Sequence, residues 1–211
     1  MNRSVQGMLF VATDINHADE ADFNHWYDRE HVEERVAIDG FLSGTRYQSL
    51  GSGRQYLGLY KTTSLADFTS KAYHAAFTRQ TDWSVANLRK MVNPMRRVCA
   101  IEAKVGFGSG SHLAIISLPD GSDVVAVHRL GETLFAEAGF ITSYLLVPDV
   151  ELSTPLPKEP RENRQLLPMM LIESSSAEAS QRLAAQACAV LNTRAQFYAM
   201  SWQLTKQEIA P

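Results

Sequence analysis

The sequence has few cysteines and no long apolar run. Cys99 and Cys188 each stand alone, outside any CxxC or Cys/His pattern, which favours free thiols in a reducing compartment. No apolar stretch approaches the roughly 18 to 20 residues that a membrane span needs. The first residues lack the apolar core and cleavage site of a secretory signal. We therefore expect a cytoplasmic protein that does not bind membranes.

Concentrated charge of one sign is also missing. The chain has 20 Lys and Arg against 23 Asp and Glu, and no basic run exceeds a pair such as Arg96-Arg97. Nucleic acid is therefore not an expected partner, because phosphate neutralisation needs a dense basic surface. Motifs of the HxH, HExxH or GxSxG type are absent, and the glycine-rich stretch 106–110 precedes a strand rather than a helix. We expect no metal and no other cofactor.

What the sequence does contain is an ordinary globular composition with one element order that occurs twice. Hydrophobic residues make up 45% of the 211 residues, enough for a sizeable core and one or two domains. Apolar runs and turn signals predict β-α-β-β-α-β in each half. In the first half, strands are expected at 7–15, 41–50, 55–62 and 97–105, and helices at 21–40 and 64–88. In the second half, strands are expected at 112–118, 141–147, 166–173 and 196–206, and helices at 124–138 and 176–191.

This repeat predicts an α+β fold of two tandem ferredoxin-like units. The expected units span 1–106 and 112–211, joined by a Gly/Ser linker at 107–111. One such unit leaves a face of its sheet bare, so we expect the two sheets to pack together as a closed α/β barrel within one chain. The Pro-rich and charged loop 148–164 could serve as a lid or as a contact surface.

The helix expected at 21–40 carries the main functional signal. At roughly 100° per residue, Glu30 and Glu34 fall in the middle of its apolar face, with His31 at the edge. Gly40 stands where a left-handed residue would end the helix. The apolar face comprises Phe23, Trp26, Tyr27, Ala37 and Ile38. Two carboxylates and an imidazole among aromatic residues predict a pocket between this helix and the sheet.

The residues of this helix resemble a known family. The run Phe23-x-x-Trp26-Tyr27-x-x-Glu30-His31 resembles the dimeric α/β-barrel superfamily, and within it the EthD-like proteins. Further matches are Gly40-Phe41, Arg46-Tyr47, Tyr56-Leu-Gly-Leu-Tyr60 and Trp83, all within the first 100 residues or so. The superfamily includes cofactor-free monooxygenases, muconolactone isomerases, polyketide cyclases, decarboxylases and haem proteins. Its usual member is a homodimer, which the tandem chain resembles in fused form.

The resemblance implies a small-molecule protein whose first half carries any chemistry, because the second half has Arg129 and Leu130 opposite Glu30 and His31. If the protein is an enzyme, we predict acid/base catalysis by His31, oriented or polarised by Glu30 or Glu34. The substrate would be small, apolar and oxygenated. Its predicted contacts are Trp26, Tyr27, Arg46, Tyr47, Tyr60 and His74, with Arg46 and Tyr47 binding an anion or a carbonyl group.

Three alternatives stay open at this point. Glu30 and Glu34 would repel each other if both were ionised, so they could share a proton, bind a metal or pair with Arg46, or this helix face could be more hydrated than its apolar pattern indicates. The Glu/His set could then be structural, in a binding or stress-related barrel without catalysis. Haem binding through His112 or His128 is a minor alternative, and a homodimer of the whole chain is a further one.

Overall fold

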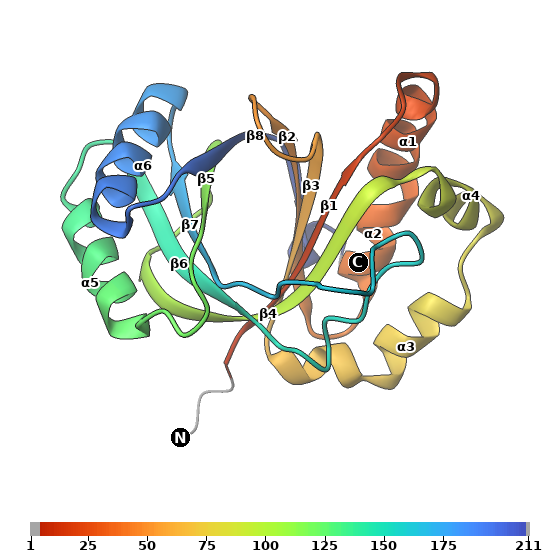
Figure 1. The fold of residues 1–211 in the computed structure, drawn as a ribbon. Coiled ribbons are helices and arrows are strands. Elements are labelled where there is room, and N and C mark those ends of the chain that lie inside the picture. The colour runs from red at the N-terminus through yellow and green to blue at the C-terminus, as the bar shows by residue number, and fades with distance from the viewer. Residues whose placement is uncertain (1–4, 210–211) are drawn as a thin grey trace.

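Eight antiparallel strands close into a barrel in the computed structural model, which describes residues 5–209 (Figure 1). Around the barrel the strands follow the order β1-β3-β2-β8-β5-β7-β6-β4. Their bounds are β1 Gly7–Asp14, β2 Phe41–Ser49, β3 Tyr56–Thr62, β4 Val92–Gly106, β5 His112–Ser117, β6 Phe140–Pro148, β7 Met169–Ser174 and β8 Ala195–Thr205. The predicted α+β barrel fold is confirmed.

Two long strands join the halves of the chain. β4 pairs with β1 through its first part and with β6 through its last part, whereas β8 pairs with both β2 and β5. The strands of the first half therefore lie in the order β4-β1-β3-β2, and those of the second half in the order β8-β5-β7-β6. In each half, the fourth strand of that half therefore lies next to its first strand, followed by its third and second strands. The boundary between units at 107–111 stays a prediction.

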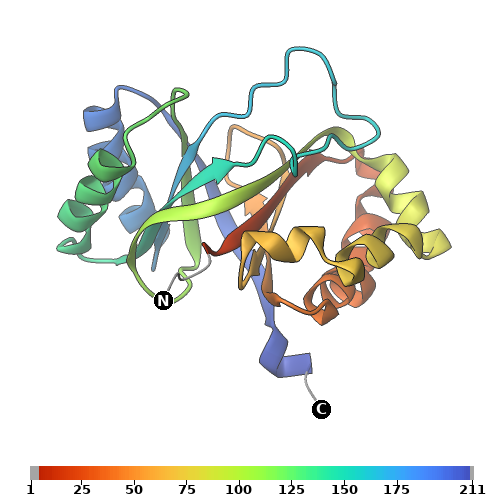
Figure 2. The ribbon, with the colours of Figure 1, turned by 90° about the horizontal axis from the view of Figure 1, so that it is seen from below.

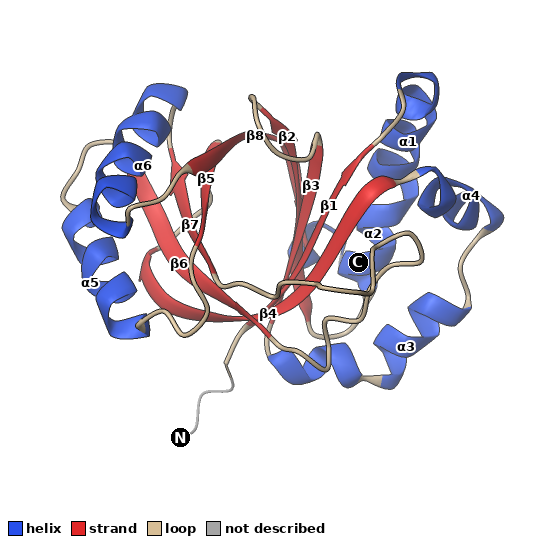
Figure 3. Ribbon diagram, viewed as in Figure 1, coloured by secondary structure: helices blue, strands red, loops and turns tan. Residues whose placement is uncertain are grey.

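The helices cover two opposite outer sides of the barrel (Figure 3). On one side lie α1 Glu20–Trp26, the wide turn η2 Tyr27–His31, α2 Val32–Ala37, α3 Lys71–Thr78 and α4 Asp82–Lys90; on the other lie α5 Val124–Phe135 and α6 Ala177–Leu191. Short helices occur at η1 His17–Asp19, η3 Leu65–Thr69 and α7 Lys206–Ile209. Between residues 5 and 209, no helix is both long and apolar enough to cross a bilayer.

The second helix predicted for the first half is wrong as one continuous element. Ser64 begins η3 with the expected capping box to Asp67, but Ser70 and Thr81 each accept a hydrogen bond from a backbone N–H and begin new helices. α4 ends at Lys90, and Pro94 lies inside β4 rather than closing a helix. β4 consequently begins five residues before the predicted start at Arg97.

Three apolar layers result from the alternation of side chains along the strands. One fills the barrel interior and includes Phe10, Tyr47 and Tyr198. The second lies between the outer face of the first-half strands and α1 to α4, and the third lies under α5 and α6. Within β3, Leu59 belongs to the interior and Tyr60 to the second layer. The interior also borders a cavity of about 190 Å³ lined by Phe10, Ile115 and Met169, whereas the candidate site lies outside the barrel, under the first helices.

Candidate functional site

A wide turn in the first helix decides which side chains face the sheet. Residues 27–31 form a π-type turn between α1 and α2, which accommodates one residue more than an α-helical turn. Every later residue is therefore rotated relative to the prediction from 100° per residue. His31, Val32, Arg35 and Val36 are buried, whereas Ala37 is exposed. The predicted placing of Glu30 and Glu34 at the centre of the buried face is wrong, because both are only half-buried.

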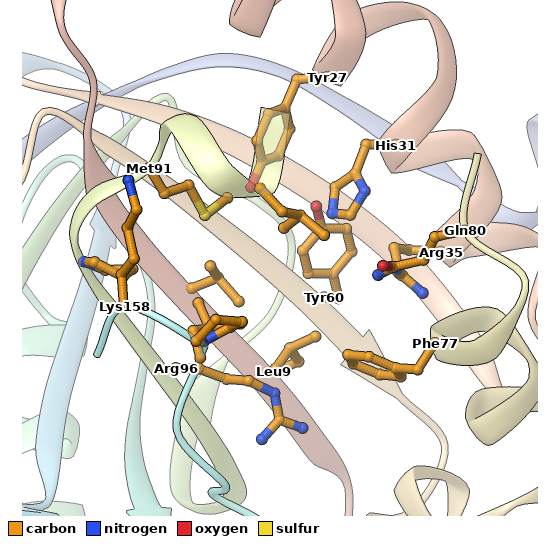
Figure 4. Close-up of a pocket in the computed structure, with 15 residues that line it drawn as sticks. Leu9, Tyr27, His31, Arg35, Tyr60, Phe77, Gln80, Met91, Arg96 and Lys158 are labelled. Atoms are coloured by element: carbon orange, nitrogen blue, oxygen red, sulfur yellow. The ribbon is translucent and has the colours of Figure 1, made fainter. Parts of the chain in front are cut away.

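A cavity of about 170 Å³ lies between this helix and the outer face of the sheet (Figure 4). The loop 149–168 contributes Leu156, Pro157 and Lys158 to its wall, and Figure 2 shows the loop reaching across to the helices of the first half. The remaining apolar walls are Leu9, Val11, Phe77, Leu88, Met91 and Pro94. The remaining polar lining residues are Tyr27, His31, Arg35, Tyr60, Gln80 and Arg96. The lining is thus mainly apolar with a few polar groups, as in small-molecule sites.

His31 is a buried, uncharged base at the end of this cavity. Its ring packs on Trp26, with 4.2 Å between ring centroids, and lies edge-on to Tyr27 at 4.9 Å. Burial holds the pKa of His31 well below its ordinary value, and the charges of Arg35 and Arg46 lower it further. Among the described residues, its Nδ1 atom has no hydrogen-bond partner. Because Nδ1 is enclosed, a ligand would exchange a proton with the part of the neutral imidazole ring that lines the cavity.

Two phenol groups stand beside His31. In Figure 4 the side chains of Tyr27, His31 and Tyr60 point toward one another. Burial raises the pKa of Tyr27 and raises that of Tyr60 well above its ordinary value, so both hydroxyls stay protonated at neutral pH. The two hydroxyls are close enough to affect each other's pKa, but Tyr60 Oη makes no well-formed hydrogen bond within residues 5–209. Both phenols line the cavity as protonated donors, and the Tyr60 hydroxyl itself is enclosed.

Glu30 joins two helices instead of entering the cavity. Its Oε1 atom accepts hydrogen bonds from Thr81 Oγ1 at 2.6 Å, Ser84 Oγ at 3.0 Å and Trp26 Nε1 at 3.2 Å. This carboxylate thus ties the first helix to the start of α4, which agrees with the structural alternative for Glu30. Glu34 borders a shallow outer depression together with Glu30. Burial raises the pKa of Glu34, and the neighbouring charge of Glu30 raises it further.

Replacing Glu30 by alanine should lower the free energy of unfolding by about 2 kcal/mol, because three donors lose their shared acceptor and Trp26 and Ser84 are buried. Glu34→Ala is the matched control and should change the free energy by less than about 0.5 kcal/mol, as ordinary surface substitutions do. Urea unfolding of both variants measures the difference. Equal effects of the two substitutions would show that the Glu30 contacts contribute little.

Arg46 lies on the other side of Tyr27 from the cavity. Its guanidinium donates to Asp28 Oδ1 at 2.6 Å and to Asn24 Oδ1 at 2.9 Å, and it lies 4.3 Å from the centre of the Tyr27 ring. The proposed pairing of Arg46 with Glu30 or Glu34 is therefore not found. Arg46 fixes the Tyr27 ring and adds positive charge near His31, but it does not line the cavity.

Two other predicted contact residues are also placed elsewhere. Tyr47 lies inside the barrel, and burial raises its pKa well above the ordinary value, with the Glu173 carboxylate adding to the effect. His74 is exposed on α3 and does not line the cavity. Trp26 is fully buried behind His31 and supports its ring. The cavity thus brings together His31, Tyr27 and Tyr60 from the predicted set.

Sequence reasoning missed Arg35, Gln80, Arg96 and Lys158 as lining residues. Arg35 follows His31 by four residues, so the helical spacing that selected His31 could have found it. The other three come from a helix junction, a strand and a loop, and only tertiary structure brings them to the same place.

The two histidines considered as haem ligands, His112 and His128, lie in the second half of the chain. His128 is partly exposed on α5, 3.7 Å from Glu132, and His112 Nδ1 lies 2.9 Å from Ser111 Oγ at the start of β5. Within residues 5–209, neither histidine lines the cavity at His31, and haem binding through either one stays a prediction.

Comparison with solved structures places the fold. The chain is similar to an anthrone oxidase-like protein, with a TM-score of 0.63, 11% identity, and coverage of 99% of this chain and 97% of that one. It is also similar to a candidate monooxygenase of Fusobacterium nucleatum subsp. nucleatum ATCC 25586, with a TM-score of 0.61, 9% identity, and coverage of 98% and 96%. A candidate monooxygenase of Lactobacillus acidophilus NCFM gives a TM-score of 0.58 at 9% identity, with coverage of 96% and 97%.

These neighbours belong to the dimeric α/β-barrel superfamily, and the chain has the same fold. No protein family profile matches the sequence, and no curated protein matches it either. At identities near 10% the likeness concerns the fold alone. Any activity must be argued from the cavity.

Proposed function

We propose that this EthD-like barrel binds a small, apolar, oxygenated molecule in the cavity and transfers a proton through His31 without a cofactor. The observation that carries the proposal is a buried, neutral imidazole that lines a mainly apolar cavity. Isomerase, cyclase, decarboxylase and monooxygenase chemistry all include such a step. The similarity in fold to candidate monooxygenases favours the last of these.

Each group near His31 has a role in this proposal. His31 removes a proton from a carbon next to a carbonyl group and becomes an imidazolium, while the electron pair of the broken C–H bond moves onto the carbonyl oxygen to form an enolate. Tyr27 or Tyr60 donates a hydrogen bond to that oxygen, where negative charge develops. The apolar walls keep bulk water away and so strengthen these interactions. Trp26 holds the imidazole ring in place.

The proposal predicts exchange of carbon-bound hydrogen. In D₂O, the protein should speed deuterium incorporation into anthrone or 2-tetralone, followed by NMR or mass spectrometry, with oxygen uptake recorded in parallel. Val11→Trp, which places a large side chain in the cavity, should abolish the exchange. Val190→Trp adds the same side chain at a position that is 71% exposed and should leave the rate unchanged.

Binding of these compounds without exchange would refute the catalytic proposal and leave a binding protein. Exchange that persists in Val11→Trp would place the chemistry outside the cavity. We also propose a reducing compartment, the cytoplasm, because Cys99 and Cys188 are both unpaired thiols.

A further inference from the structure

Arg35 is a buried cation that forms no ion pair within the described residues 5–209, although its charge lowers the pKa of the neighbouring Glu34. Its side chain is 4% exposed, and within residues 5–209 it makes no ion pair and no side-chain hydrogen bond, with Nη1 fully enclosed. The nearest aromatic group is Phe77, whose ring centre lies 5.1 Å from the guanidinium carbon. Burying a charge without a partner is costly, and native proteins rarely do so unless something else neutralises it. Arg35 lines the cavity, so the missing partner can come from a ligand.

The charged side chains that line the cavity are all basic. Arg35, Arg96 and Lys158 line it, and no Asp or Glu among the described residues does so. The three cations differ in what they already bind. Arg96 donates to the carbonyl groups of Leu152 and Thr154 and to the Tyr73 hydroxyl, and Lys158 is exposed on the loop. Arg96 keeps one enclosed donor, Nε, without a partner, whereas the Arg35 guanidinium makes no hydrogen bond among the described residues.

We propose that Arg35 binds the carboxylate of the ligand, so that the natural substrate is a small apolar acid with an aromatic or unsaturated body. This inference rests on the proposed function, since it uses the same cavity. A planar guanidinium matches the two oxygens of a carboxylate. Gln80 also lines the cavity and supplies a further donor (Figure 4). The apolar wall residues then contact the body of the ligand, with its reactive end toward His31.

The first test compares a carboxylate with its neutral amide. By isothermal titration calorimetry, 2-naphthoate should bind at least about ten times more tightly than 2-naphthamide, since charged hydrogen bonds typically contribute a factor of this size or more. Arg35→Gln should remove that preference while the amide still binds, and Arg35→Lys should keep part of it. Arg79→Gln, at an exposed position after α3, is the matched control and should bind like the wild type.

Two results would overturn the inference. One is a carboxylate preference that survives in Arg35→Gln or never exists in the wild type. The other is displacement of 2-naphthoate by inorganic phosphate at equal concentration, which would point to a phosphate group as the natural anion.

A second test needs no ligand. Arg35→Met keeps most of the apolar stem and removes the unpaired charge, so the variant without ligand should have a higher melting temperature than the wild type. Added 2-naphthoate should stabilise the wild type and leave Arg35→Met unaffected. If Arg35 were needed only for the fold, Arg35→Met would melt at a lower temperature and the inference would be wrong.

The inference and the proposed function can fail separately. His31→Gln should abolish deuterium exchange but retain the Arg35-dependent preference for 2-naphthoate. Exchange that survives in His31→Gln would refute only the role of His31. His31-dependent exchange without a carboxylate preference would refute only the role of Arg35.

Discussion

Glu159→Ala is expected to lower the free energy of unfolding by about 3–5 kcal/mol, the range found when one partner of a buried ion pair is removed. Glu159 and Arg97 are 6% and 7% exposed, and the carboxylate lies within salt-bridge distance of both Arg97 and Arg164. It also accepts from the backbone N–H groups of Arg96 at 3.1 Å and Leu156 at 3.3 Å. Alanine would remove the acceptor that these donors share, and Arg97 Nη1 would keep only its hydrogen bond to the Arg96 carbonyl.

The loop 149–168 depends on this carboxylate for its position. Arg164 donates to Glu159 and to the carbonyl groups of Ser153 and Arg96, so the loop is bound both to itself and to β4. Leu156, Pro157 and Lys158 directly precede Glu159 and form part of the cavity wall. The same substitution should therefore open the cavity and weaken ligand binding.

Chemical unfolding and hydrogen exchange measure the two effects. Glu162→Ala removes an exposed carboxylate from the same loop and is the matched control, with an expected change below about 0.5 kcal/mol. Faster amide exchange confined to 149–168 would show local opening, whereas loss of protection throughout would show global destabilisation. A Glu159→Ala protein as stable as Glu162→Ala would mean that the buried pair contributes nothing net.

The pH dependence of this contribution has a definite sign. Burial opposes ionisation of Glu159, but the hydrogen bonds from Arg97 and Arg164 outweigh it and lower the pKa of the carboxyl group. A carboxyl whose pKa is lower in the folded state stabilises the fold above its unfolded pKa and loses that contribution as the pH falls. The stability difference between wild type and Glu159→Ala should therefore shrink as the pH drops through the acid range below about 4.5.

The fold was predictable because its signals are local and repeated. Each strand of the barrel carries its own apolar pattern, and Gly139-Phe140 repeats Gly40-Phe41, where both glycines adopt positive φ angles of 82° and 88°. The arrangement of the helices was less predictable. The break before α4 depends on a single side chain, Thr81, which both begins that helix and binds Glu30.

The site could be predicted only in part. His31, Tyr27 and Tyr60 were found because they belong to one motif and one strand pattern. The π-type turn at 27–31 has no signal in a periodicity calculation, and its extra residue exchanges Glu34 for Arg35 at the buried face. The predicted acidic pocket is consequently a cationic one. Lys158 could not be predicted as a lining residue either, because nothing in the sequence shows that the loop 149–168 reaches the helices of the first half.

His31→Gln should reduce the deuterium exchange rate by about 10²- to 10⁴-fold, the usual contribution of a positioned general base. Glutamine keeps the approximate size and polarity of the side chain but cannot accept the proton at neutral pH. Glu34→Gln is the matched control on the same helix and should retain the wild-type rate, since Glu34 does not line the cavity. Loss of activity in Glu34→Gln but not in His31→Gln would assign the base to the carboxylate instead.

The pH profile of the wild type should show the depressed pKa of His31. Arg35 on the same helix and Arg46 on β2 repel a proton on the ring, and the neighbouring Tyr27 and Tyr60 are neutral phenols. Arg96 and Lys158 on the opposite wall add no negative charge. Activity should therefore persist well below pH 6.5 and fall only when His31 is protonated. Arg35→Met removes one repelling charge and should move this acid limb to higher pH.

Stability provides a readout of the same group that does not depend on turnover. Below about pH 6.5 the unfolded chain binds a proton at His31 that the folded protein does not bind, so folding loses up to about 1.4 kcal/mol per pH unit from this group. The loss should begin as the pH falls below the unfolded pKa and end at the lower folded pKa. His31→Gln should lack this slope between pH 6.5 and the acid range. Equal slopes in wild type and variant would show that His31 titrates normally in the folded protein. The prediction that His31 is a neutral buried base would then be wrong.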